Sequence, residues 1–77
     1  MATDAPVIAG DGWVVDWGVV PHRATVRLAR ALTDDDTAQL DAVLGVTAAT
    51  ERITALASAG TRWFVVQLDT GRVEPRD

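Results

Sequence analysis

Trp13-Val14-Val15-Asp16-Trp17-Gly18-Val19-Val20 is the stretch that decides the fold of this 77-residue chain. A β-strand turns alternate side chains to opposite faces, so its odd-numbered residues, two tryptophans and two valines, share one face. The even-numbered face is nearly as apolar. A strand that is apolar on both faces usually lies inside a sheet covered on both sides. The rest of the chain is too short to supply both covers, which predicts a partner, in the simplest case a second copy.

Three strands are expected, and all three follow from runs of apolar and β-branched residues. The first covers 13–20 and ends at Pro21, which cannot donate to a strand ladder. The second covers 24–31, where apolar and polar residues alternate, and we expect it to pair with the first as an antiparallel hairpin. The third covers 61–69.

Two helices are expected between the second and third strands. Thr33 followed by three aspartates is a strong helix start, and Gly45 is a natural stop. Residues 46–59 fit a helix better than a strand, with Thr47 or Thr50 as the cap. The outer segments are polar or rich in glycine and proline. They are interpreted as a flexible arm over 1–11, with a short edge pairing at Val7-Ile8 left open, and a flexible tail over 71–77, flanking one domain over 12–70.

The predicted fold class is α+β, a ββααβ domain whose three-stranded, mainly antiparallel sheet has the order 2-1-3 and carries two helices on one face. A third strand parallel to the second is the alternative. The order 2-1-3 is preferred because it puts the doubly apolar strand in the centre. The expected core is formed by apolar residues of the three strands and both helices: Trp13, Val15, Trp17, Val19, Val26, Leu28, Leu40, Val43, Leu44, Ile53, Leu56, Phe64, Val66 and Leu68.

The sheet face away from the helices is the predicted interface. It combines apolar and charged side chains in an area that is unusual on a monomer. Its residues are Val14, Asp16, Val20, Arg27, Trp63, Val65 and Gln67. The predicted function is therefore a non-enzymatic protein-interaction module that forms a homodimer through this face.

Composition argues against most catalytic and metal-dependent functions. The chain has no cysteine and a single histidine, His22, so a disulfide framework and a His- or Cys-based metal site are both excluded. Asp34-Asp35-Asp36 is interpreted as helix capping rather than a cation site. Asp16 is interpreted as paired with Arg27 rather than as a catalytic acid, and Ser58 lies in no nucleophile motif. We expect no catalytic residue, no metal and no cofactor.

Two other functions remain open from the sequence. One is an acidic inhibitor or adaptor that docks on a host protein through the three aspartates. The other is weak nucleic-acid binding through Arg23, Arg27 and Trp63, which the net charge of −4 disfavours. All seven basic residues are arginine, as in GC-rich coding sequences, so we expect an actinobacterial or phage source. The N-terminus lacks the basic start of a signal peptide and no apolar run spans a membrane, so a cytoplasmic location is expected.

The segment Glu51–Asp69 is a helix, a glycine and then an apolar strand in sequence. This succession is similar to that of many α/β regulatory domains, STAS domains among them. The Asp-Ser-x-Gly segment that such domains use for regulation is missing here, so the resemblance implies no function for this chain.

Overall fold

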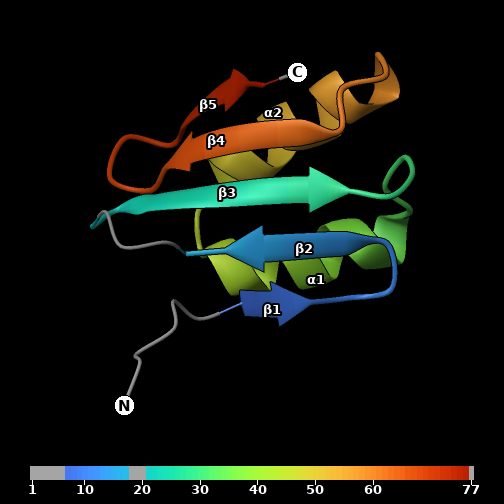
Figure 1. Cartoon of the computed structure of the whole chain (residues 1–77), viewed down its shortest axis with the longest axis horizontal. Helices are drawn as coiled ribbons and strands as arrows, with labels where there is room; N and C mark the ends of the chain where they lie inside the picture. Colours follow the sequence, from blue (N-terminus) through green and yellow to red (C-terminus); the bar gives the residue numbers. More distant parts are fainter. Residues whose placement is uncertain (1–6, 18–20, 77) are drawn as a thin grey trace.

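The computed structural model describes residues 7–17 and 21–76. Both helices lie against one face of a single antiparallel sheet, which gives two layers (Figure 1). Within the sheet, each strand pairs with its neighbours in the sequence. Over the described residues, the elements in chain order are β1 (Val7–Ala9), β2 (Trp13–Asp16), β3 (Arg23–Leu28), α1 (Asp34–Leu44), α2 (Thr47–Ser58), β4 (Trp63–Gln67) and β5 (Arg72–Pro75).

The predicted three-stranded sheet of order 2-1-3 is wrong, although the α+β class with two helices on one face is found. The sheet has five strands in the order β1-β2-β3-β4-β5, and β4 pairs with β3 instead of β2. The reason lies in the helix pair. α1 and α2 run in opposite directions, so they return the chain to the end of the sheet where β3 finished (Figure 1). β4 therefore enters antiparallel to β3 and beside it.

Two short strands extend the sheet beyond the range 12–70. β1 and β2 are joined by residues 10–12, and the Gly10 N–H donates to the Trp13 carbonyl at 2.9 Å. A Cβ at Gly10 would lie 2.2 Å from the Trp13 indole, so only glycine allows this approach. At the other edge, Gly71 has φ of 75° and closes the turn into β5 through its N–H bond to the Gln67 carbonyl.

β3, and not the stretch that begins at Trp13, is the central strand. Because helices cover one face only, the centre needs just one apolar face, and the alternating pattern of β3 provides it. In β2, Trp13 and Val15 are buried on the helix side, as expected, whereas Val14 on the opposite face is 37% exposed. The predicted positions of Val19 and Val20 lie outside the described residues.

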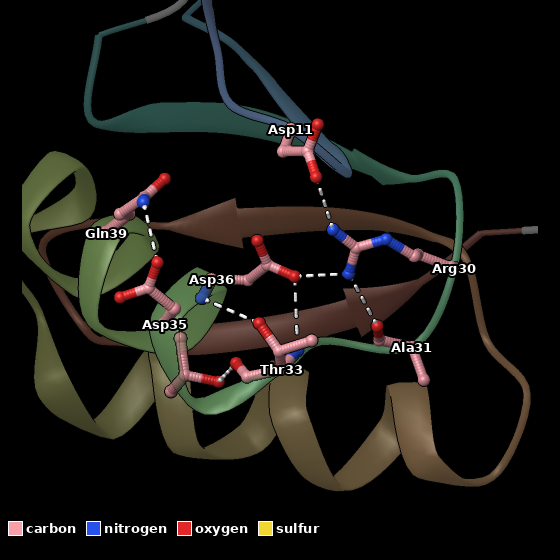
Figure 2. Close-up of polar contacts among 8 residues, drawn as sticks. Asp11, Arg30, Ala31, Thr33, Asp35, Asp36 and Gln39 are labelled. Atoms are coloured by element: carbon pink, nitrogen blue, oxygen red, sulfur yellow. Dashed lines mark hydrogen bonds and ion pairs between the residues drawn. The ribbon is translucent and has the colours of Figure 1, made fainter.

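Local capping signals place the two ends of α1. Thr33 caps α1 in a capping box: its hydroxyl accepts from the Asp36 N–H, and the Asp36 carboxylate accepts from the Thr33 N–H (Figure 2). Gly45 ends α1 in the left-handed conformation, as predicted. The helical interpretation of 46–59 is confirmed, but neither predicted threonine caps α2. Val46 is its N-cap, and the Thr50 hydroxyl instead donates to Asp41 of α1 at 3.0 Å.

The core lies between the sheet and the two helices. One cross-strand row on this side contains Val15, Val26 and Phe64, all fully buried. Leu40 of α1 and Ile53 of α2 are also fully buried and belong to the same cluster. The sheet therefore presents its opposite face without any helix over it.

Candidate functional site

We call the sheet face that points away from the helices the open face. In an antiparallel sheet, paired residues point to the same side, so the strand registers define cross-strand rows on this face. The aromatic row contains Ala9, Val14, Arg27 and Trp63. The acidic row, one step along the strands, contains Val7, Asp16, Thr25, Val65 and Glu74.

A groove of about 270 Å³ lies in the open face over β1, β2, β3 and β4. Val14 and Trp63 are two of its walls, and they are 37% and 36% exposed. Apolar and charged groups therefore meet in one hollow, because both rows contribute to it. The groove is lined by Val7, Val14, Asp16, Thr25, Arg27 and Trp63.

Arg27 and Trp63 form the most defined contact of the open face. They are Cα partners across β3 and β4, and the Arg27 guanidinium carbon lies 4.6 Å from the centre of the Trp63 ring. A cation over an aromatic ring at a partly exposed site contributes about 0.5–1 kcal/mol. The contact fixes a large aromatic group at one end of the groove.

The structure brings most of the predicted interface residues together. Val14, Asp16, Arg27 and Trp63 all line the groove, and Gln67 pairs with Arg23 farther along the sheet. Val65 points to the same face but is only 6% exposed, because its neighbours on β3, β4 and β5 surround it. The seventh predicted interface residue, Val20, lies outside the described residues.

Sequence reasoning missed the contribution of the β1 strand to the groove. Val7 is 59% exposed and lies opposite Asp16 across the β1–β2 pairing. The available signal was Asp11-Gly12, a two-residue connection typical of a hairpin. The sequence left an edge pairing at Val7-Ile8 open, and the structure contains it, but the predicted interface did not include this strand.

A second polar cluster lies on the helix side of the sheet and supports the fold. Arg30 donates to Asp36 at the start of α1 and, at 3.1 Å, to Asp11 in the β1–β2 turn (Figure 2). Its guanidinium, together with the Thr33 N–H, holds the pKa of the buried Asp36 carboxyl below its ordinary value. Arg30 thereby ties the first hairpin to α1 and does not share the face of Arg23 and Arg27.

The protein is expected to lose stability in acid through Asp36. Its pKa is lowered in the folded state, so its contribution is complete above the ordinary aspartate pKa of about 3.9 and is lost as pH falls through the lower folded value. Urea unfolding between pH 7 and pH 2 measures this. The stability gap between the natural protein and Asp36→Asn should narrow below about pH 4. A gap that stays constant down to pH 2 would contradict the assignment.

The other candidates for chemistry do not come together. The Ser58 hydroxyl donates to the Thr54 carbonyl of its own helix, and His22 lies in the turn before β3 with φ of 61°. Of the three aspartates, Asp36 caps and pairs as described, and Asp35 accepts from Gln39. Among the described residues, no group of three histidines, cysteines or carboxylates is placed to hold a metal ion. Neither helix in the described part of the chain is long and apolar enough to cross a membrane.

No protein family, curated protein or solved structure matches this chain.

Proposed function

We propose that this protein is a small non-enzymatic interaction module that pairs with a second copy of itself through the open face. One observation carries the proposal: Val14 and Trp63 stay exposed around a groove on a sheet that has helices on its other side only. Apolar area rimmed by charges is typical of protein-binding surfaces. The helices and the core cover the other face of the sheet, so the open face is the sheet face that is left available to a partner.

The charges of the open face favour a second copy as the partner. A two-fold interface needs a surface that complements itself. In the proposed dimer, the two-fold axis lies between the two open faces, runs perpendicular to the strands and passes between the aromatic and acidic rows. The aromatic row of each copy therefore lies over the acidic row of the other copy. Trp63 of one copy then lies over Val65 of the other, and Arg27 comes near the partner's Asp16. The row that contains Arg27 thus meets the row that contains Asp16 of the other copy. Two copies of this chain therefore complement each other without a different protein as partner.

The substitution Val14→Glu tests this pairing. In the proposed arrangement Val14 lies over Asp16 of the partner, so a carboxylate there places two like charges together. At about 100 μM, we expect light scattering to give the natural protein at least twice its 8.2 kDa chain mass, and Val14→Glu half the mass of the natural protein. The control is Val14→Thr, which keeps a β-branched, uncharged residue and should keep the mass of the natural protein.

Two results would overturn this function. One is a natural protein that remains a single chain at about 1 mM, a concentration at which even a weak specific dimer is half formed. The other is a Val14→Glu variant that keeps the natural mass. Far-UV circular dichroism should show that the variant is folded, as expected for a position that is 37% exposed.

Single-stranded nucleic acid is the second candidate, because Arg23, Arg27 and Trp63 do lie on one face of adjacent strands. Bases stack on exposed aromatic rings, and arginines contact phosphates. The net charge of −4 opposes this binding. Oligonucleotide binding that weakens steeply with salt would favour it over self-association.

The cytoplasmic location and the actinobacterial or phage source stay predictions from the sequence.

A further inference from the structure

The two edges of the sheet differ in how they are protected from pairing with another strand. Natural sheets protect an edge with charges or proline. β5 has this protection in Arg72, Glu74 and Pro75. β1 has none: its three residues are uncharged, all are exposed, and Val7 and Ile8 are 59% and 41% exposed. Among the described residues, β2 is the one strand that pairs with β1.

The register of β1 shows which backbone groups its outer side offers. In an antiparallel ladder, hydrogen-bonded and non-hydrogen-bonded pairs alternate. The Gly10 N–H donates to the Trp13 carbonyl, so Gly10 and Trp13 form a hydrogen-bonded pair. Two residues along, Ile8 therefore directs its N–H and C=O toward β2. Val7 and Ala9 direct theirs to the outer side.

We propose that β1 pairs antiparallel with β1 of a second copy, about a two-fold axis at Ile8. Val7 and Ala9 flank Ile8 symmetrically, so each Val7 meets Ala9 of the other copy and both pairs exchange their outward N–H and C=O groups. The two Ile8 side chains form the central non-hydrogen-bonded pair, in which side chains come closest. The two sheets become one continuous sheet.

The sequence of the edge argues for a second copy as its occupant. Residues 7–9 carry no charge, so two copies can approach although each has a net charge of −4. The symmetric placement of the outward groups around Ile8 satisfies both strands at once. The opposite edge is protected, so the pairing ends at two copies instead of growing into a fibre.

This edge pairing goes beyond the proposed function and depends on different contacts. Ile8 points to the helix side of the sheet, opposite to Val14 and Trp63. Each contact is closed by its own two-fold axis. A variant can therefore remove one contact and leave the other.

A single introduced cysteine tests the register, because the natural chain has none. In Ile8→Cys the two thiols meet across the non-hydrogen-bonded pair, at a separation that a disulfide spans. In Val7→Cys each thiol faces Ala9 of the partner instead. With oxidised glutathione, we expect Ile8→Cys to form a disulfide-linked dimer about tenfold faster than Val7→Cys, as followed on non-reducing gels.

Two further variants separate this contact from the open face and from chance collisions. Adding Ala9→Pro to Ile8→Cys removes an outward N–H without touching the ladder to β2, and should slow linking to the rate of Val7→Cys. Adding Val14→Glu to Ile8→Cys should leave linking fast, whether or not the open face pairs. Equal rates for Ile8→Cys and Val7→Cys, or slow linking in the Val14→Glu background, would overturn the edge pairing.

Discussion

Replacing Phe64 by alanine is expected to lower the free energy of unfolding by about 3–5 kcal/mol, the range for a fully buried aromatic residue. Phe64 is the largest fully buried side chain and lies in β4 beside the central strand. It lies beside its cross-strand partner Val26 on the helix side of the sheet, and Leu40 and Ile53 from the helices belong to the same cluster. Removing the ring leaves a cavity that strands and helices surround, so it cannot close by the movement of one side chain.

This loss is a large fraction of the total free energy of unfolding, because a domain of this length is stabilised by only about 4–12 kcal/mol. Urea unfolding at low protein concentration measures it without any contribution from self-association. Trp63→Ala is the matched control, since it removes a neighbouring aromatic side chain from the open face of the same strand. A loss as large in Trp63→Ala as in Phe64→Ala would contradict the assignment of the core to the helix side.

Replacing Asp36 by alanine is expected to lower the melting temperature by roughly 5–15 °C. The capping interactions contribute to the free energy of unfolding, and because a small domain has a small unfolding entropy, a given loss of free energy shifts its melting temperature by many degrees. The buried carboxylate has two partners: it accepts from the Thr33 N–H at 3.1 Å and pairs with Arg30. Its removal opens the capping box and, among the described residues, leaves the exposed Asp11 as the remaining carboxylate partner of Arg30. The start of α1 and its tie to the first hairpin weaken together.

Asp35→Ala is the matched control, because Asp35 carries the same charge in the same helical turn but is exposed. Differential scanning calorimetry should show a small shift for Asp35→Ala and a large one for Asp36→Ala. Asp36→Asn keeps an oxygen for the Thr33 N–H but loses the charge that binds Arg30. Its melting temperature should therefore lie between those of Asp35→Ala and Asp36→Ala. Equal shifts for both alanine variants would mean that the turn responds only to general helix-dipole charge.

Much of the candidate site was predictable from the residues alone. Alternation along Trp13–Asp16 correctly separated buried Trp13 and Val15 from exposed Val14. The same reasoning put Arg27 and Trp63 on one face of the sheet, where they stack. These predictions hold because the period of side chains along a strand is a property of the backbone and does not depend on which strand lies next to it.

The sequence by itself determined the central elements: both helices with the cap at Thr33 and the stop at Gly45, and the alternation of the three longer strands. These depend on neighbours within a few residues. Only the tertiary structure decided the strand order and the edge strands β1 and β5, because pairing between strands depends on where the α1–α2 pair returns the chain. It also decided that Val65 is shielded on an otherwise open face, since residues from three strands must meet to cover it.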